Sequence, residues 1–221
     1  MGHRAVVVVA GGERAPALPA NLPHDALVIA ADSGVDHALA LGLRVDVAVG
    51  DFDSVSPGGL ARVEADGARI ERHPADKDKT DLELALDEAV RAGAHDITVL
   101  GIGGGRLDHL LANALLLASP AFAHCQIVAF DRDARVHVVH AGGAATPLPG
   151  QPGEILTLLP VGGAAVGVTT AGLRYPLRGE SLTPGTSRGV SNVVGALDAS
   201  VQLEAGTLLA VFPGQGEEDN A

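Results

Sequence analysis

Over the first 130 residues, short continuous runs of Val, Ile, Leu and Ala alternate with stretches of helical spacing, and this alternation strongly limits the possible folds. A run that is apolar on both faces fits a strand of a parallel sheet whose two faces are covered by helices. Apolar residues recur at helical spacing from Leu82 to Val90 and from Leu107 to Leu115. The pattern therefore predicts an α/β domain with a mostly parallel, Rossmann-like sheet. The candidate strands are Arg4–Ala10, Leu27–Ala31, Val45–Gly50, Ala68–His73, Asp96–Gly101 and Gln126–Asp131.

The last 80 residues have a different character, because they are rich in Val, Thr, Gly and Pro and carry no long helical pattern. Short apolar runs separated by turn residues predict a small all-β sandwich or barrel. Residues 141–153 are rich in Gly, Ala and Pro and suit a linker, so we expect one domain at residues 1–135 and another at 145–214. The candidate strands of the second domain lie at 154–161, 164–170, 173–177, 191–197, 199–204 and 207–212.

The charge balance and the single cysteine exclude several classes of protein. The chain of 221 residues has 15 Lys and Arg against 27 Asp and Glu, a formal charge of -12, which argues against a general nucleic-acid binder. Cys125 has no cysteine partner for an internal disulfide, so we expect a reducing compartment, the cytoplasm. No run approaches the roughly 18 to 20 apolar residues of a membrane span, so we expect no membrane segment.

Polar clusters follow the predicted strands. Asp32 and Ser33 come directly after one strand, and Asp51 and Asp53 come after the next. Two further clusters, at 76–81 and 101–108, follow later strands. Each cluster alone could be an ordinary turn, since Asp, Ser and Gly are common turn residues. In a parallel sheet, however, these loops meet at the carboxyl edge, where open α/β sheets bind their ligands.

Asp51 and Asp53 flank Phe52, so a tight loop can bring two carboxylates to one cation while Phe52 turns into the protein. Carboxylates this close repel each other unless a cation lies between them. Mg²⁺ together with phosphate oxygens is the ligand that suits such a pair.

The chain contains only two lysines, Lys77 and Lys79, and both lie in one short acidic segment. An ammonium group is a compact charge that suits a phosphate oxygen beside carboxylates, so we expect at least one of them to contact phosphate. Thr80 and Glu83 have the spacing of a capping box for the helix that follows. Asp81 then falls in the first helical turn, where it can reach a metal held by Asp51 and Asp53.

A glycine-rich loop at 101–105 precedes Arg106 and a helix that carries Asp108 and Asn113. The loop is neither a dinucleotide fingerprint nor a P-loop, because Arg106 stands where the third glycine of G-x-G-x-x-G would be and no G-x-x-x-x-G-K-[ST] occurs. Its backbone can still approach an anion closely, with Arg106 at the helix start to bind phosphate.

Taken together, these motifs resemble the thiamine pyrophosphokinase family. The resemblance covers nearly the whole chain and implies that family's reaction, transfer of the diphosphate of ATP to the hydroxyethyl group of thiamine with release of AMP. It further implies that residues 1–135 form an α/β ATP-binding catalytic domain, that residues 145–214 form a β-sandwich that binds thiamine, and that a homodimer places the thiamine site between its subunits. The motifs that carry it are ADSG at 31–34, GDFDS at 50–54, DKDKTDLELAL at 76–86, GIGGGRLDHLLAN at 101–113, GLRYPL at 172–177 and SRGVSN at 187–192.

The resemblance also implies roles for single residues. Mg²⁺ is expected on Asp51, Asp53 and Asp81, the three carboxylates that the residues themselves indicate. Lys77 and Arg106 are expected to offset charge during the transfer. The residues expected to line the ATP and diphosphate crevice are Asp32, Ser33, Asp78, Thr80, Arg106, Asp108 and Asn113, and those expected at the thiamine are Gly189, Ser191 and Asn192.

The chain departs from the family's pattern at the thiamine site. Bacterial members often follow the Ser-Asn pair with Glu and an aromatic residue, whereas this chain has Val193 and Val194 and no tryptophan. Tyr175 and Phe212 are the aromatic candidates of the second domain.

Three alternative functions stay open at this point. The same scaffold could transfer diphosphate to another alcohol, such as 6-hydroxymethyl-dihydropterin. Residues 51–55 also fit the D-x-D-x-[TV] pattern of haloacid-dehalogenase-like phosphohydrolases, although two predicted strands precede them. A non-catalytic regulator that binds nucleotide or thiamine is the third.

Overall fold

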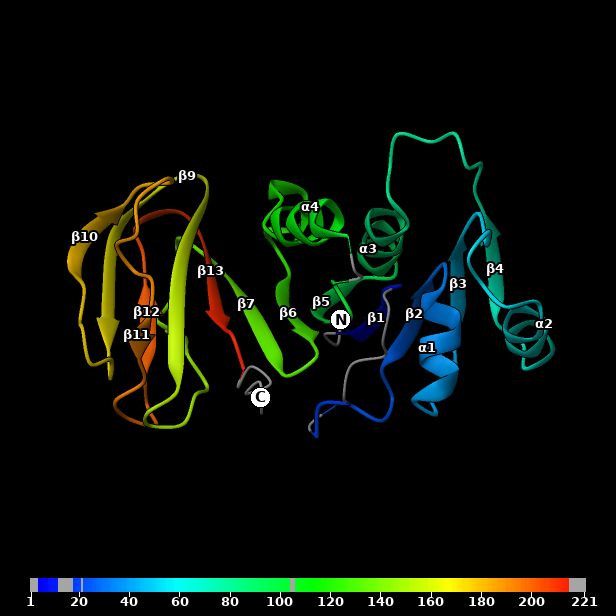
Figure 1. Ribbon diagram of the computed structural model, residues 1–221, viewed down its shortest axis with the longest axis horizontal. Helices are drawn as coiled ribbons and strands as arrows, with labels where there is room; N and C mark the ends of the chain where they lie inside the picture. Colours follow the sequence, from blue (N-terminus) through cyan, green and yellow to red (C-terminus); the bar gives the residue numbers. More distant parts are fainter. Residues whose placement is uncertain (1–3, 12–17, 21, 104–105, 215–221) are drawn as a thin grey trace, which may run out of the picture. The chain divides into compact units, whose positions relative to one another are not determined.

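The computed structural model describes residues 4–11, 18–20, 22–103 and 106–214. The chain divides into two compact units, residues 1–116 with 124–132 and residues 117–123 with 133–221. Each unit has a hydrophobic core of its own. The α-helices of the described residues lie in the first part of the chain (Figure 1).

The first unit is built on strands in the order β4-β3-β2-β1-β5-β6, and every neighbouring pair among them is parallel. Val7 stands opposite Val28, and Ala31 stands opposite Val49. This register places the carboxyl ends of β2 and β3 side by side. The strands are β1 Arg4–Val9, β2 Leu27–Ala31, β3 Val47–Gly50, β4 Arg69–Arg72, β5 Ala94–Leu100 and β6 Gln126–Asp131.

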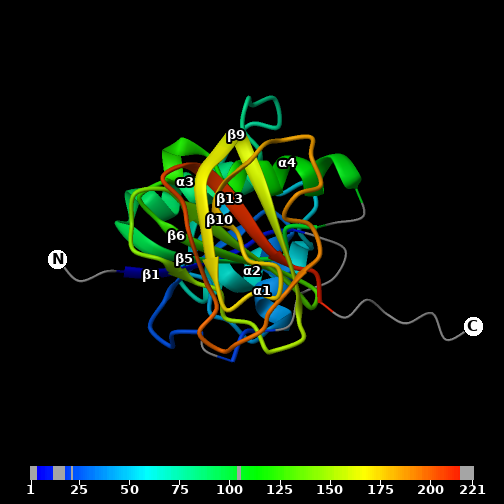
Figure 2. The same ribbon diagram turned by 90° about the vertical axis from the view of Figure 1, so that its left-hand side faces the viewer.

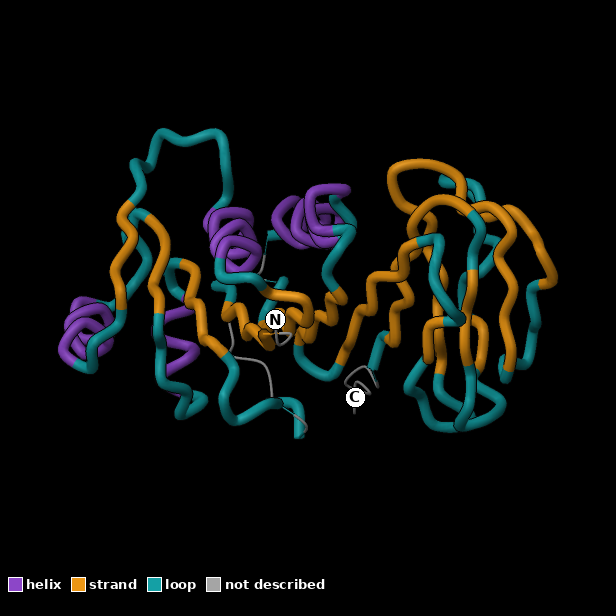
Figure 3. Tube along the Cα trace, turned by 180° about the vertical axis from the view of Figure 1, so that it is seen from behind, coloured by secondary structure: helices purple, strands orange, loops and turns teal. Residues whose placement is uncertain are grey.

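The helices cover both faces of these strands, with α3 and α4 on one face and α1 on the other (Figures 1 and 3). Both apolar stripes of the sequence form helices, whereas α1 and α2 escape prediction because they are short and α2 begins Pro57-Gly58-Gly59. Ser56 caps α2, its Oγ accepting from the Gly59 amide at 3.0 Å. None of the helices in the described ranges is long and apolar enough to cross a membrane. The bounds are α1 Gly34–Ala40, α2 Pro57–Ala65, α3 Asp81–Arg91 and α4 Leu107–Leu117.

The second unit is rich in β-strands. Its strands follow the order β7-β13-β9-β12-β8, and neighbouring strands in this order pair antiparallel. Its core includes Leu156, Leu158, Val168, Leu208 and Phe212. The elements are a single 3-10 turn η1 Pro120–Phe122 and the strands β7 Ala134–His140, β8 Thr146–Pro147, β9 Ile155–Ala171, β10 Arg178–Leu182, β11 Asn192–Val193, β12 Ser200–Gln202 and β13 Ala205–Phe212.

Strand β9 organises the second unit, because it pairs with β10, β11, β12 and β13. The sequence predicts two strands here, yet β9 runs unbroken for 17 residues and bends on the way (Figure 2). Gly162 and Gly167, both at positive φ, permit the bend. The expected strand at 173–177 forms only a bridge between Leu173 and Val194.

The expectation of a mostly parallel sheet is wrong for the chain as a whole, because its strand pairings are mixed. The reason lies in the connections after residue 133. Parallel strands need a crossover of a dozen or more residues, but β9 and β10 are joined only by residues 172–177 and pair antiparallel.

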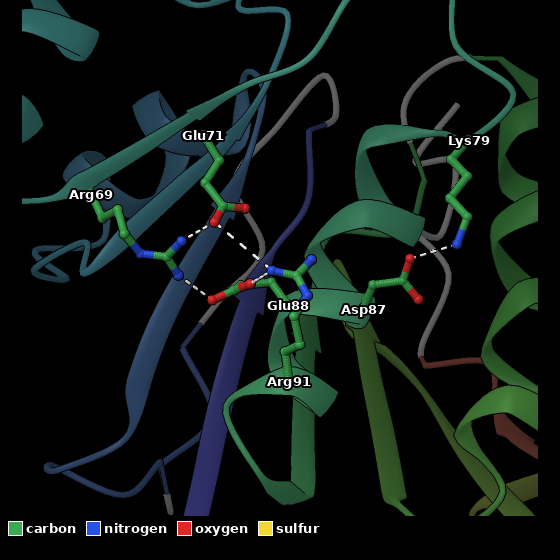
Figure 4. Close-up of polar contacts among 6 residues, drawn as sticks. All are labelled: Arg69, Glu71, Lys79, Asp87, Glu88 and Arg91. Atoms are coloured by element: carbon green, nitrogen blue, oxygen red, sulfur yellow. Dashed lines mark hydrogen bonds and ion pairs between the residues drawn. The ribbon is translucent and has the colours of Figure 1, made fainter.

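A charged network joins α3 to the edge strand β4 (Figure 4). Glu88 is buried, with 5% of its surface exposed, and its carboxylate accepts hydrogen bonds from Arg69 of β4 and Arg91 of α3. Glu71 pairs with Arg69 and lies 3.8 Å from Arg91. A buried carboxylate is stable only when it is paired in this way.

Replacing Glu88 by Ala is expected to lower the free energy of unfolding by about 1–3 kcal/mol, because a buried charged hydrogen-bond acceptor is lost and two arginines lose their common partner. Asp87→Ala on the same helix is the matched control, since the Asp87–Lys79 pair is more exposed (31% and 44%) and is expected to contribute less to stability than the Glu88 network. Urea denaturation followed by the helical circular dichroism signal measures both variants. Equal stability of the two would contradict the structural role of Glu88.

Candidate active site

The loops that follow β2, β3 and β5, together with the segment between β4 and α3, line one cleft of about 600 Å³ in the first unit. The cleft therefore lies at the carboxyl edge of the parallel strands, as the sequence predicts. Predicted site residues in its lining are Asp32, Ser33, Asp51, Lys77, Thr80, Asp81, Arg106 and Asn113.

The loop after β3 turns sharply to present its carboxylates. Gly50 has φ 152°, and a Cβ there would lie 3.2 Å from Asp81 Oδ1. Phe52 has φ 61° and is 9% exposed, with the Arg72 guanidinium 5.1 Å from its ring centroid. Phe52 is thus turned into the protein as expected, and Asp51 and Asp53 are left on either side of it.

Three carboxylates gather at this turn: one oxygen from each of Asp32, Asp51 and Asp53 lies within 4.8 Å of the others. Asp32 Oδ1 is buried and has no hydrogen-bond partner. An unpartnered carboxylate oxygen beside two further carboxylates fits a hard divalent cation such as Mg²⁺.

Burial is the main cause that raises the pKa of Asp32 above its ordinary value. A backbone hydrogen bond from Ser33 acts in the opposite direction. The nearby charges of Asp81, Asp53 and Asp51 raise the pKa further. The cluster therefore favours any bound positive charge.

Lys77 supplies one such charge within the cleft. Its Nζ donates a hydrogen bond to Asp51 Oδ2 at 3.3 Å. The same Nζ lies 3.1 Å from Asp81 Oδ1 and forms an ion pair with it, but the two atoms are not aligned for a hydrogen bond. Burial alone would lower the pKa of Lys77, but the pairs with Asp81 and Asp51 outweigh it, so this pKa is raised and the ammonium stays charged. The structure thus groups Asp32 with Asp51 and Asp53, and pairs Asp81 with Lys77.

Lys79 is placed differently from Lys77, although it also lines the cleft. Its Nζ contacts Asp87 Oδ2 at 2.6 Å and Glu83 Oε1 at 3.2 Å, both on α3 (Figure 4 shows the Asp87 pair). Thr80 caps α3, its Oγ1 accepting from the Glu83 amide at 3.2 Å. The Glu83 side chain pairs with Lys79. Asp78 is exposed and is not among the residues that line the cleft.

The glycine-rich loop after β5 is held by two side chains from other elements. Asn113 Nδ2 donates to the Ile102 carbonyl at 2.9 Å, and the Gly103 amide donates to Asp131 Oδ1 at 2.9 Å. A Cβ at Gly103 would lie 2.6 Å from Asp131 Oδ2, which explains the glycine. The sequence predictions do not include Asp131. Its place at the end of the predicted strand Gln126–Asp131 could have indicated it, because the other predicted acidic residues also follow strand ends. Gly104 and Gly105 lie outside the described residues.

Arg106 and Asp108 form a bidentate pair at the start of α4. Arg106 Nε donates to Asp108 Oδ1 at 3.2 Å, and Arg106 Nη2 donates to Asp108 Oδ2 at 2.6 Å. Both side chains are about two-thirds exposed (66% and 64%). The hydrogen bond from Arg106 lowers the pKa of Asp108 to about 2. Arg106 is thus at the cleft and is balanced by Asp108.

The predicted thiamine residues lie in a second pocket, of about 380 Å³, within the second unit. Gly189, Ser191 and Asn192 line it from one segment, and Tyr175 lines it from another. Both polar ends of the Asn192 amide contact the backbone of Tyr175, at 3.1 and 2.7 Å.

Arg106→Ala is expected to return the pKa of Asp108 from about 2 toward its ordinary value of 3.8, because the main cause of the shift is the hydrogen bond from Arg106. A carboxyl-detected NMR titration of both proteins measures the change. A titration of Asp108 that is the same in the variant would show that the pair does not form in solution.

Comparisons with known proteins agree on one family. Residues 19–129 match the family model described as thiamin pyrophosphokinase, catalytic domain, and residues 145–208 match thiamin pyrophosphokinase, vitamin B1 binding domain. A thiamine pyrophosphokinase from Bacillus subtilis is 29% identical over 191 residues, which cover 86% of this chain and 89% of that protein.

Solved structures agree with the sequence comparisons. The structure of the Bacillus subtilis thiamine pyrophosphokinase superposes with a TM-score of 0.84 at 27% identity and covers 96% of this chain and 100% of that one. A thiamin pyrophosphokinase family protein from Enterococcus faecalis superposes with a TM-score of 0.78 at 30% identity and covers 94% and 97%. With both family models matched along its length, the chain belongs to the thiamine pyrophosphokinase family.

Proposed function

We propose that the protein transfers the diphosphate of ATP to the hydroxyethyl oxygen of thiamine and releases AMP. The observation that carries the proposal is the cleft at the carboxyl edge of the strands, which is lined by Asp32, Asp51, Lys77 and Arg106. Asp53 is exposed and lies outside the lining, and it completes the cluster of three carboxylates. The hydroxyl oxygen of thiamine bonds to the β-phosphorus of ATP, the bond between that phosphorus and the bridging oxygen of AMP breaks, and the hydroxyl proton is released. Positioning and electrostatic stabilisation supply most of the rate in such transfers.

The two halves of the chain divide the substrates between them in this proposal. Residues 1–135 form the ATP-binding catalytic domain, and residues 145–214 form a β-sandwich that binds thiamine. The matches to a catalytic-domain model at 19–129 and a vitamin B1 binding model at 145–208 support this division.

Mg²⁺ fits the carboxylates of the first unit. Asp32, Asp51 and Asp53 would hold it, and the unpartnered Oδ1 of Asp32 supports the inclusion of a residue that the sequence assigned to ATP alone. Asp81, whose buried Oδ1 forms an ion pair with Lys77 but no hydrogen bond, stays a proposed ligand on the other side of Lys77. The bound ion would neutralise phosphate charge and orient the phosphate oxygens.

The basic residues would bind the phosphates directly. Lys77 can exchange its contacts with Asp51 and Asp81 for a phosphate oxygen, since its ammonium stays charged between them. Arg106 would release Asp108 and turn its planar fork to phosphate. Asn113 would hold the loop backbone at Ile102 in place. The remaining residues proposed at the ATP are Asp32, Ser33, Asp78, Thr80 and Asp108.

Two wider expectations remain proposals. A homodimer would place the thiamine site between its subunits, and the cytoplasm would suit a chain whose single cysteine, Cys125, is free and buried. The alternatives of a pterin diphosphokinase, a haloacid-dehalogenase-like hydrolase and a non-catalytic regulator gain no support from the matched family models or from the relatives named above.

The direct test is the formation of AMP by the purified protein with ATP and Mg²⁺, with and without thiamine, with the products separated by mass. We expect thiamine-dependent AMP together with thiamine diphosphate.

Asp53→Asn is expected to lower kcat by about 100-fold or more, because one carboxylate of the cluster loses its charge. Normal turnover by Asp53→Asn would contradict the metal assignment. Release of inorganic phosphate in place of AMP by the wild-type protein would contradict the proposed reaction.

The two lysines give a matched pair of variants. Lys77→Ala is expected to lower kcat/KM for ATP by about 100-fold or more, because it removes the charge between Asp51 and Asp81. Lys79→Ala is expected to change kcat/KM by less than about fivefold, since Lys79 contacts carboxylates of α3. Initial rates at varied ATP measure both, and similar losses in the two variants would contradict the distinction.

A further inference from the structure

The loop after β3 carries an exposed carboxylate of the cluster between two residues that are packed into the core. Phe52 is buried, and Val55 is partly buried against the same core, whereas Asp53 and Ser54 between them are exposed. Ser54 Oγ donates to Asp53 Oδ1 at 2.7 Å. A loop that must hold a carboxylate at a fixed place needs support from groups outside the loop.

Asp36 of α1 supplies such support at Ser56, the residue that ends the loop and caps α2. Asp36 Oδ2 accepts from the Ser56 backbone amide at 2.8 Å, and Asp36 Oδ1 accepts from Ser56 Oγ at 2.6 Å. Ser56 Oγ in turn accepts from the Gly59 amide at 3.0 Å. Both oxygens of one carboxylate are therefore used on a single residue of another element, in hydrogen bonds that the charge of the carboxylate strengthens.

The fold leaves room for this contact at Gly59. A Cβ at this position would lie 2.1 Å from Asp36 Oδ1 and 2.9 Å from Ser56 Oγ. Glycine inside a helix costs about 1 kcal/mol relative to alanine, and Gly59 lies within α2. The close approach of the Asp36 carboxylate gives the physical reason for a glycine at this place.

The contact between Asp36 and Ser56 joins the two loops that carry the carboxylate cluster. α1 begins two residues after Asp32, and Ser56 lies three residues after Asp53. Neither Asp36 nor Ser56 is among the residues that line the cleft, and the group of carboxylates close enough to share a cation does not include Asp36. Asp36 can therefore act on the site through the loop backbone or through its charge, but not by direct contact.

We infer that Asp36 is a positioning residue of the active site. Through Ser56 it fixes the loop that presents Asp51 and Asp53, and it contacts neither the metal nor a substrate. The inference rests on the proposed function for the role of this loop in binding Mg²⁺.

The test compares Asp36→Ala with Asp36→Asn in the full-length protein. Both variants remove the charge, but an asparagine can still accept from the Ser56 amide and donate to Ser56 Oγ. Asp36→Ala is expected to weaken Mn²⁺ binding and to lower kcat by about 10-fold or more each, because two charge-assisted hydrogen bonds are lost. Asp36→Asn is expected to stay within about threefold of the wild type in both quantities. Electron paramagnetic resonance measures bound Mn²⁺, and initial rates of AMP formation give kcat.

Two further variants complete the set. Ser56→Ala removes one of the two hydrogen bonds and keeps the Asp36 charge, so it is expected to weaken Mn²⁺ binding by about 2- to 10-fold. Asp66→Ala is the matched control, because Asp66 lies at the end of α2, is exposed and pairs with Arg62. It is expected to change Mn²⁺ binding and kcat by less than about twofold. KM for thiamine is expected to stay within about twofold in every variant. Melting temperatures check the fold.

Wild-type Mn²⁺ affinity in Asp36→Ala, or in Ser56→Ala if Asp36→Ala does not fold, would overturn the inference. An equal loss in Asp36→Asn would assign the effect to charge and would overturn it as well, and so would the absence of Mn²⁺ binding by the wild-type protein. A wild-type protein that binds Mn²⁺ without forming AMP would contradict only the proposed reaction. Weaker Mn²⁺ binding by Asp36→Ala than by Asp36→Asn would then still support the role of Asp36.

Discussion

The parallel register of β2 and β3 is the constraint on which the candidate active site depends. Ala31 lies opposite Val49, so the residues that follow these strands emerge side by side. Asp32 and Asp51 are thereby brought together although 18 residues separate them, and Asp53 joins them around the buried Phe52. Like charges at this distance destabilise one another. Lys77 offsets part of that repulsion, and a bound cation would offset more. The fold therefore creates a site that is stabilised by binding positive charge.

The charged residues of the first unit serve different purposes according to where the backbone places them. Glu88 is buried between Arg69 and Arg91 and ties α3 to β4, while α3 in turn carries Thr80 and Asp81 at its start. Lys79 pairs with Glu83 and Asp87 of α3. Lys77, only two residues away, pairs instead with Asp51 of the candidate site. Residue type alone does not separate these roles, but burial and partners do.

Sequence reasoning located most of the cleft because it depended on local signals: apolar runs end at polar clusters, and Thr80 begins a helix. The sequence predicts a metal site of Asp51, Asp53 and Asp81 and places Asp32 at the ATP, and both assignments stay proposals. The closeness of Asp32 to Asp51 and Asp53 is not visible in chain order, because it depends on which strands are neighbours. Sequence reasoning missed Asp131 for the same reason, because this residue contacts Gly103 across β5 and β6. It divided β9 at Gly162, a residue that usually ends a strand but here lets one bend.

The scarcity of aromatic residues shapes the second unit. Its core uses Phe212 and aliphatic side chains, and Tyr175 is its exposed aromatic residue other than histidine among the described residues. The Asn192 amide fixes the backbone of Tyr175, because it accepts from the Tyr175 amide and donates to the Tyr175 carbonyl. The sequence resemblance predicts Asn192 at the substrate, and the structure gives a physical reason for an asparagine there. Its side-chain amide donates to the Tyr175 carbonyl and accepts from the backbone amides of Tyr175 and Val193. An aspartate would lose the donor, and a leucine would leave three backbone groups unsatisfied.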